Sequence, residues 1–475
     1  MYFTKYFIEH TKKSGDKRLL NTLTGEIIDI SEKHIEAMKK LQENNSFPID
    51  PDIENDFKRK GFIYESVNKE LELVENMANE AFNSMKKRPL TFFVHISNNC
   101  NLNCDYCNYA SIEHTHDVMT QEDIDKVFLA IEKIYTENDA EKATIVLFGG
   151  EPFVKENYGI IEYFMEGYRA LVENGSKTEK RYSLLAFSNG VDLPYYKEFL
   201  EVNKRNIDYL FVTLNGPKEI HNKSRVFSDG SGSFDYTVEG INTLINLSIP
   251  MWLVVNTDRK NIQYLPFISR IISEKEWDKK TSFMGCCVSR VKNRYMTVEN
   301  SMTEDQMIEE IMSMVADNKI QTNKFNFEDM RLLKNVMNFF DFSDKKTKFG
   351  EEDVRQHITG CGNRSNQYSF TVDGHIYPCS PAAGNTKYAI GRYKPEIEIK
   401  IPKEKCWNSR SVLELESCRQ CKALFICGGG CAFEATERNG SEYVPVCPNT
   451  EKIIHAYLDS IENNTGLIHR ETVYK

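Results

Sequence analysis

The chain has 475 residues, 40% of them hydrophobic and 27% charged, which is enough apolar material for a large core and two or three domains. Its formal net charge of −10 argues against a nucleic-acid-binding protein, because such proteins usually carry a basic surplus. Apolar runs long enough to span a membrane and a signal peptide are both missing from the sequence, which predicts a soluble cytoplasmic protein that does not bind membranes.

Residues 1–88 have the pattern of a small independent unit. Short strands are expected at 5–8 and 18–28, the second folded into a hairpin at its Thr-Gly pair. A helix capped by Ser31 and a second helix, DIENDFKRK, follow. Strands followed by paired helices predict a winged-helix-like module, and residues 76–88 are expected to form a polar linker to the rest of the chain.

Beyond Pro89 the pattern changes to short apolar strands that alternate with amphipathic helices. The strands are rich in β-branched and aromatic residues, as buried parallel strands are. They are expected at 91–96, 143–148, 182–187, 208–214, 251–256 and 281–288. Six such strands predict an α/β fold over 89–300, a partial (β/α)6 TIM-like barrel, with an open doubly wound sheet as the alternative.

The last third of the chain changes character twice. Residues 301–354 are polar with a helical pattern and are expected to form a helical bridge. From 355 to 475 the cysteines crowd together, and periodic segments nearly vanish until a final helix around 452–461. A region with so little apolar periodicity needs another source of stability, which metal coordination would supply.

Thirteen cysteines in a chain without a secretion signal indicate metal or redox chemistry rather than a disulfide framework. Cys100, Cys104 and Cys107 follow the first barrel strand as C-x3-C-x2-C. Three thiolates from one loop suit three irons of a [4Fe-4S] cluster and leave the fourth iron open. The alternative is a structural zinc ion completed by His95 or His114. The cluster is favoured because α/β sheets place their active sites at the carboxyl ends of strands.

This spacing, with an aromatic residue before the last cysteine, resembles the radical S-adenosylmethionine (SAM) enzymes. Downstream, FGGEPF resembles the family's GGEP motif, FSNG a position that contacts the SAM ribose or carboxylate, and VTLNGPKEIHNKSR a stretch that contains an arginine facing the SAM carboxylate. The family usually has Asp-Gly where this chain has Asn215-Gly216. The resemblance implies SAM contacts from Tyr106, Gly149, Gly150, Glu151, Ser188, Asn189 and Arg225. The glycines would admit a ligand close to the backbone, and the glutamate would accept from its ammonium group.

A second group of cysteines lies near the C-terminus, and its pattern resembles the SPASM extension of radical SAM proteins. That extension implies two auxiliary [4Fe-4S] clusters and therefore three clusters in all. By this resemblance the first would be bound by Cys361, Cys379 and Cys431. The second would be bound by Cys418, Cys421, Cys427 and Cys447. A set of three leaves an iron open to a substrate thiolate, unless Cys406 or the Cys286-Cys287 pair completes it. Two structural zinc sites are the alternative.

The N-terminal pattern LLNTLTGEIIDIS resembles the PqqD-like module of maturases that act on ribosomally made peptides. Such modules add a leader peptide as an extra strand at a sheet edge. A dimerisation or packing domain is the alternative.

Together these resemblances imply a radical SAM maturase of ribosomally made peptides (a RiPP maturase). It would cleave SAM to a 5′-deoxyadenosyl radical and modify a precursor peptide that carries a leader, most simply by forming a Cys thioether crosslink, with flavodoxin or ferredoxin as electron donor. The alternatives are formylglycine formation of the anaerobic sulfatase-maturing type, carbon–carbon crosslinking and, from another class, a zinc-stabilised peptide-binding scaffold. Acidic residues are too abundant for the sequence to single out a general base.

Overall fold

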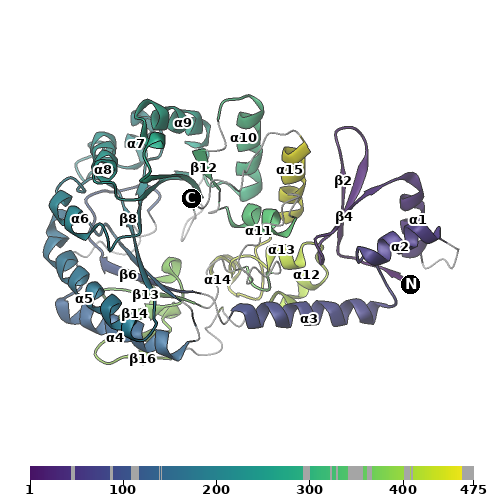
Figure 1. Cartoon of the computed structure of the whole chain (residues 1–475), viewed down its shortest axis with the longest axis horizontal. Coiled ribbons are helices and arrows are strands. Elements are labelled where there is room, and N and C mark those ends of the chain that lie inside the picture. The colour runs from purple at the N-terminus through teal and green to yellow at the C-terminus, as the bar shows by residue number, and fades with distance from the viewer. Residues whose placement is uncertain are drawn as a thin grey trace.

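The structure is a computed structural model with a curved sheet, helices around its outer side, and an N-terminal unit at the opposite end (Figure 1). The helices of residues 416–462 lie between them. Among the described residues, no helix is both long and apolar enough to cross a bilayer. The structure describes residues 1–43, 49–85, 89–107, 117–138, 140, 142–291, 300–320, 324–327, 330–340, 357–360, 366–400, 407 and 410–462.

The N-terminal unit contains two small antiparallel sheets and three helices. A three-stranded sheet has the order β2-β3-β4, and β1 pairs with β5. The strands are β1 (Tyr2–Phe3), β2 (Phe7–Thr11), β3 (Lys17–Asn21), β4 (Ile27–Ile30) and β5 (Ile63–Tyr64). The helices are α1 (Glu32–Gln42), α2 (Pro51–Arg59) and α3 (Val67–Met85). The predicted hairpin, the helix capped by Ser31 and the second helix are all present.

The prediction of a polar linker from residue 76 onward is wrong as far as that segment is described. Most of it belongs to α3, a helix of 19 residues. Val74, Ala78 and Ala81 are buried on this helix in a cluster that includes Leu424 and Phe425. Their spacing of four and three residues places them on one face of a helix. Because this apolar face is narrow and lies among Glu and Asn residues, the sequence alone suggests a polar linker.

The central sheet has eleven strands in the order β12-β11-β10-β9-β8-β7-β6-β13-β14-β15-β16. From β6 to β12 each strand pairs in parallel with the next in the chain. These strands are β6 (Leu90–Ser97), β7 (Ala143–Gly149), β8 (Tyr182–Ser188), β9 (Tyr209–Thr213), β10 (Met251–Thr257), β11 (Phe283–Arg290) and β12 (Phe325–Asn326). The six predicted strands are confirmed.

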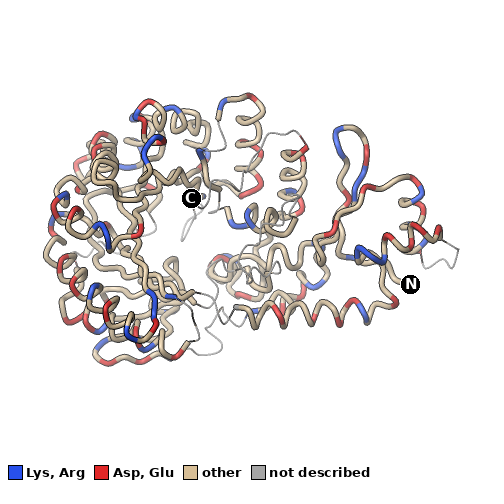
Figure 2. The backbone as a smooth tube through the Cα atoms, in the orientation of Figure 1, with Lys and Arg blue, Asp and Glu red and all other residues tan. Residues whose placement is uncertain are grey.

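From β6 to β12 the order of the strands in the sheet follows their order in the chain without reversing, so right-handed crossovers place all the connecting helices on one side of the sheet. The doubly wound alternative, which has helices on both sides, is therefore excluded. The sheet curves like a partial barrel. The helices on that outer side are α4 (Gln121–Glu137), α5 (Tyr158–Lys177), α6 (Lys197–Asn203), α7 (Lys218–Ser224), α8 (Phe234–Asn246) and α9 (Leu265–Glu274). Lys and Arg alternate with Asp and Glu along them, a pattern typical of solvated helix faces (Figure 2).

The cysteine-rich region adds strands to the same sheet, which the sequence did not predict. β13 (Gln367–Phe370) pairs in parallel with β6, and three antiparallel strands continue beyond it. These are β14 (His375–Tyr377), β15 (Gly391–Arg392) and β16 (Glu398–Ile399). The strand that leads into the Cys100 loop is therefore paired on both sides.

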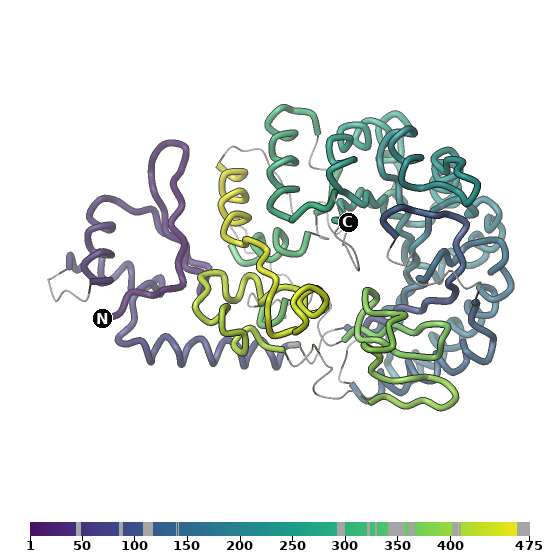
Figure 3. The backbone as a smooth tube through the Cα atoms, turned by 180° about the vertical axis from the view of Figure 1, so that it is seen from behind, coloured from purple at the N-terminus to yellow at the C-terminus, as the bar shows by residue number. Residues whose placement is uncertain are grey.

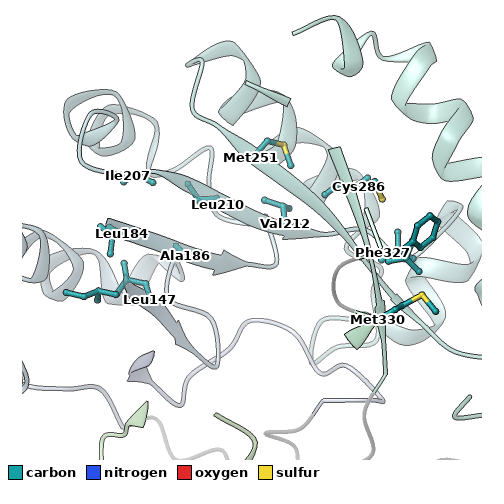
Figure 4. Close-up of a cluster of buried hydrophobic side chains, with 14 of the residues drawn as sticks. Leu147, Leu184, Ala186, Ile207, Leu210, Val212, Met251, Cys286, Phe327 and Met330 are labelled. Carbon is teal, nitrogen blue, oxygen red and sulfur yellow. The ribbon is translucent and has the colours of Figure 1, made fainter. Parts of the chain in front are cut away.

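The main core lies between the sheet and its outer helices. Leu147, Leu184, Ala186, Leu210 and Val212 extend from neighbouring strands into this cluster (Figure 4). Cys286 also belongs to it and is 0% exposed, so this thiol is a packed core residue and is not available to complete an auxiliary cluster.

The predicted bridge is helical where it is described, but it is also part of the core. Met307, Ile311 and Val336 share the main cluster with Ile454 and Leu458 of the last helix. Residues 341–354 of the predicted bridge lie outside the described residues. The helices of the C-terminal part are α10 (Glu304–Ala316), α11 (Arg331–Phe339), α12 (Glu416–Arg419), α13 (Leu424–Cys427), α14 (Ala432–Asn439) and α15 (Thr450–Glu462).

We expect Gly240→Ala in α8 to destabilise the barrel. A Cβ atom at this position would lie 1.9 Å from the Gly190 carbonyl oxygen, a backbone atom of the turn after β8. The cost should be about 1–3 kcal/mol in the free energy of unfolding, measured by denaturant titration followed by circular dichroism. The matched control is Gly159→Ala in α5, where a Cβ meets nothing within 4 Å and stability should hold or rise by up to about 1 kcal/mol. Equal effects of both changes would contradict the assigned packing.

Candidate active site

The residues predicted to bind SAM and the first cluster converge at the carboxyl ends of the parallel strands. The cysteine loop follows β6, the Gly149–Glu151 turn ends β7, and Ser188 and Asn189 end β8. Parallel strands present these ends at one edge of the sheet, so residues far apart in the chain meet there.

The cysteine loop holds three partly buried thiols close to one another. The Cys100 sulfur accepts hydrogen bonds from the Leu102 amide at 3.4 Å and from the Asn189 side chain at 3.9 Å. The Cys107 amide donates to the Cys104 carbonyl oxygen at 3.1 Å. Burial raises the pKa of the Cys100 thiol to about 12, and Glu151 and the neighbouring thiols add to the rise. A bound metal centre would supply the positive charge that these thiolates need.

The alternative at these thiols is a structural zinc ion, which would need a fourth ligand besides Cys100, Cys104 and Cys107. His95, one of the two suggested zinc ligands, packs against the ring of Phe148, and His114 lies outside the described residues.

The glycines of the Gly149–Glu151 turn allow two backbone segments to touch. The Gly150 amide donates to the Ser97 carbonyl oxygen at 2.8 Å, and the Glu151 amide donates to the Asn99 carbonyl oxygen at 2.8 Å. A Cβ on Gly150 would lie 2.2 Å from that Asn99 oxygen. The glycines therefore bring the end of β7 into contact with the base of the cysteine loop. This role is separate from the predicted one of admitting a ligand close to the backbone.

Glu151 joins the ends of β7 and β8. Its carboxylate accepts from the Asn189 amide at 2.5 Å, the Ser188 hydroxyl at 2.9 Å and the Phe153 amide at 3.1 Å. It is only 2% exposed, and burial raises its pKa to about 7. A cation bound beside it would favour the charged form and lower that pKa.

Tyr106 fixes the far end of the cysteine loop. Its hydroxyl accepts from the Arg225 guanidinium at 2.6 Å and from the Asn215 amide group at 2.9 Å. The Asn215 side-chain oxygen in turn accepts from the Asn256 backbone amide at 3.0 Å. An amide can donate and accept at once, which an ionised aspartate cannot, so the departure from Asp to Asn has a structural use here.

Sequence reasoning missed a set of asparagines around this site. Asn101 accepts from the Asn189 side chain at 2.6 Å and donates to Asp192 at 2.9 Å. Asn261 donates to the carbonyl oxygens of Asn215 at 3.2 Å and Asn256 at 2.7 Å. The available signal was that Asn215 directly follows a predicted strand and that Asn256 is the last residue of another.

In the C-terminal region, most of the cysteines predicted to bind auxiliary clusters come together in two places. Burial raises the pKa of Cys421, and the neighbouring thiols of Cys427 and Cys447 add to that rise. Burial also raises the pKa of Cys418 to about 11, with a further contribution from Cys427. These electrostatic interactions indicate that Cys418, Cys421, Cys427 and Cys447 lie near one another.

Cys379 and Cys431 lie in a separate hydrophobic cluster with Trp407 and Phe433. Cys361 and Cys406 lie outside the described residues. Gly360, the residue before Cys361, packs on the Gly430 backbone so tightly that a Cβ would lie 2.1 Å from the Gly430 carbonyl oxygen.

A buried arginine lies among these thiols, which no sequence pattern indicated. Arg410 is 2% exposed, and its guanidinium donates to the carbonyl oxygens of Gly429 at 2.7 Å and Gly430 at 2.9 Å. Burial lowers its pKa, while the nearby thiols of Cys418 and Cys431 act in the opposite direction. A buried cation at this place would favour ionised sulfur ligands.

Comparison with known proteins agrees with this site. Residues 94–258 match the model of the radical SAM superfamily, a range that contains all the SAM-site residues described above. The chain is 23% identical to the radical SAM cyclopropyl synthase TigE of Paramaledivibacter caminithermalis, over 93% of this chain and 91% of TigE. It is 21% identical to a cysteine-type anaerobic sulfatase-maturating enzyme of Clostridium perfringens, over 70% of this chain and 86% of the relative. The chain is a radical SAM enzyme.

Two solved structures share the fold at low sequence identity. The enzyme anSMEcpe, solved with bound AdoMet and a Cp18Cys peptide, matches with a TM-score of 0.56 at 18% identity, over 79% of this chain and 99% of that one. Streptococcus suis SuiB, solved bound to its precursor peptide SuiA, matches with a TM-score of 0.52 at 14% identity, over 93% of this chain and 98% of that one. The expectation of a radical SAM partial barrel is confirmed.

We expect Gly150→Ala to impair binding of the cluster at the cysteine loop. The added methyl group would push the turn after β7 away from the Asn99 carbonyl oxygen and disturb the base of the loop. The protein should retain less iron after anaerobic reconstitution, measured by iron analysis and by absorbance of the iron–sulfur chromophore. Gly159→Ala, on the outer helix α5, should retain the full amount. Unchanged iron in the Gly150 variant would show that this contact does not support the loop.

Proposed function

We propose that this radical SAM enzyme modifies a ribosomally made precursor peptide. The observation that carries the proposal is the convergence of the three thiols, Glu151 and Arg225 at one edge of the partial barrel. The thiols of Cys100, Cys104 and Cys107 would hold a [4Fe-4S] cluster, and SAM bound beside it would, on reductive cleavage, supply the radical that removes a hydrogen atom from the substrate.

The residues present fit the cluster and SAM. Cys100, Cys104 and Cys107 would hold the cluster. Arg225 is 6% exposed, and its Nε atom has no hydrogen-bond partner in the structure, so a buried donor is left for a ligand carboxylate. Glu151 would accept from the SAM ammonium group, with Ser188, Asn189 and the glycines of the turn around it.

A peptide substrate is supported by the relatives. TigE is named for forming cyclopropyl groups, the Clostridium perfringens relatives are named as sulfatase-maturating, and both solved structures hold peptides. We propose two auxiliary [4Fe-4S] clusters on the C-terminal cysteines, as the sequence predicts, with Arg410 between them. Electrons would come from a flavodoxin or ferredoxin.

For the bond formed, a Cys thioether crosslink remains the proposal, because the first auxiliary set has three predicted cysteines and an iron open to a substrate thiolate. Carbon–carbon bond formation is a second candidate, favoured by the match to TigE along 93% of this chain. Alkylation of the product peptide with iodoacetamide separates them, since a thioether consumes a cysteine thiol and a carbon–carbon bond does not.

The N-terminal unit offers an edge where a leader peptide could add as a strand. β4 is an edge strand of the three-stranded sheet, and α1 follows it directly after Ser31. An incoming extended peptide would hydrogen-bond to the free side of β4 and lie beside α1. The unit also packs on the cysteine-rich region, where the Tyr6 hydroxyl donates to the Arg419 carbonyl oxygen at 3.0 Å. A leader held at β4 would thus be anchored to the domain predicted to carry the auxiliary clusters.

Replacing Cys100, Cys104 and Cys107 together by Ala should abolish SAM cleavage, because no ligand set for the first cluster remains. The iron content should fall from about twelve to about eight per chain if three clusters of four irons form in the native protein. Deoxyadenosine is measured by chromatography after anaerobic incubation with SAM and dithionite. Cys286→Ala, which removes a thiol of the packed core, should leave both quantities unchanged. Continued deoxyadenosine formation by the triple variant would refute the assignment of the cluster.

Hydrogen–deuterium exchange tests the leader-binding edge without a mutation. Adding a candidate precursor peptide with its leader should slow amide exchange in 27–30 and leave the opposite edge strand, 7–11, unchanged. Protection confined to the barrel strands would remove the leader-binding proposal but leave the radical chemistry intact.

A further inference from the structure

The N-terminal sheet docks on the last helix of the chain. Figures 1 and 3 both show α15 between this sheet and α10. Ile8 and Leu20 of the sheet share the main hydrophobic cluster with Ile453, Ile454 and Leu458 of α15. The two elements come from opposite ends of the sequence, and their interface contains a polar group that the proposed reaction does not use.

This group is centred on His10 of β2, which is 3% exposed. Its Nδ1 atom lies 3.0 Å from Nδ1 of His455, a residue 445 positions away in the chain. Its Nε2 atom lies 3.6 Å from an Asp459 oxygen and 3.7 Å from a Glu462 oxygen. These distances are too long for hydrogen bonds, and Nε2 has no hydrogen-bond partner in the structure. A buried ring nitrogen therefore points at two carboxylates without bonding to either.

The hydrogen bond between the two histidines is consistent with a tautomer of His10 suited to metal binding. If His10 donates its Nδ1 proton to His455, its Nε2 atom carries a lone pair that faces Asp459 and Glu462. A lone pair that faces two carboxylates is electrostatically unfavourable unless a cation lies between them. Histidines that bind metals commonly donate their other ring N–H to an acceptor, usually a carboxylate, a backbone carbonyl or water, and His455 would take that place here.

We propose that His10, Asp459 and Glu462 bind one divalent transition-metal ion of the zinc class. The three ligand atoms all lie within 4.8 Å of one another. Donors at ~2.0–2.2 Å from a tetrahedral ion are separated by about 3.3–3.6 Å, close to the distances from Nε2 found here. An imidazole beside two carboxylates favours zinc-like ions over Mg²⁺ or Ca²⁺, which prefer oxygen ligands.

The surrounding charges permit such an ion. Arg18 Nη1 lies 3.4 Å from the same Glu462 oxygen, so it orients that carboxylate and offsets one of the two negative charges. One net negative charge remains to attract the cation. His455, whose Nδ1 atom lies 3.0 Å from that of His10, stands on the same face of α15 as Asp459. The ion would join β2 to α15 and so fix the N-terminal unit to the part of the chain that follows Cys447.

Zinc binding to the full-length protein with its iron–sulfur clusters reconstituted tests this site, because cluster-bound cysteines do not compete for the added metal. After chelation and desalting, calorimetric titration with zinc chloride should show about one site per chain. X-ray absorption at the zinc edge should show a first shell of nitrogen and oxygen only, at ~2.0–2.1 Å. Absence of a site, or sulfur in the first shell, would overturn the proposal.

Two single substitutions test which side chains bind the zinc ion. Asp459→Asn changes a side chain that is 47% exposed, so the fold should hold, and it should weaken zinc binding at least tenfold. His10→Gln should abolish binding. The matched control, Glu451→Gln, removes a carboxylate from the first turn of the same helix and should bind zinc as the unmodified protein does. Zinc affinity that is unchanged by Asp459→Asn would refute the site, whatever the His10 variant does. Because the readout is metal affinity, a failure here is distinguishable from a failure of the proposed peptide chemistry.

Discussion

The active site depends on one close contact between two stretches of backbone, the turn after β7 and the base of the cysteine loop. Gly150 and Glu151 donate to the carbonyl oxygens of Ser97 and Asn99, and no side chain fits between them. Because Glu151 also binds the end of β8, this contact fixes three strand ends relative to one another. The thiols at one side and the buried carboxylate at the other therefore keep their separation without help from a ligand.

The sequence was informative wherever a feature is local. The six barrel strands, the capped helices and the cysteine spacings could be predicted because each depends on residues that are close together in the chain. Features that depend on distant partners could not be predicted. β13 joins β6 across about 270 residues of chain, and Arg410 gains its place from the glycines at 428–430. α3 was missed because Glu and Asn residues interrupt its apolar positions, although Val74, Ala78 and Ala81 are buried.

The same distinction between local features and distant partners applies to the candidate site. The motifs named the thiols, Glu151 and Arg225, which the structure brings to one edge of the sheet. Of the asparagines that connect them, the motifs named Asn189, but its hydrogen bond to Asn101 joins two separate loops and could not be predicted. The residues that carry the chemistry were thus predictable, whereas the network that orients them required coordinates.

The pairing of β6 with β13 has a consequence for dissecting this protein. A fragment that ends before residue 366 would retain every barrel motif, yet it would leave one side of β6 bare. Unpaired strand edges recruit other chains, so such a fragment should self-associate rather than behave as a minimal catalytic core. The sheet that bears the radical chemistry and the region rich in cysteines have therefore to be produced, and to evolve, as a single piece.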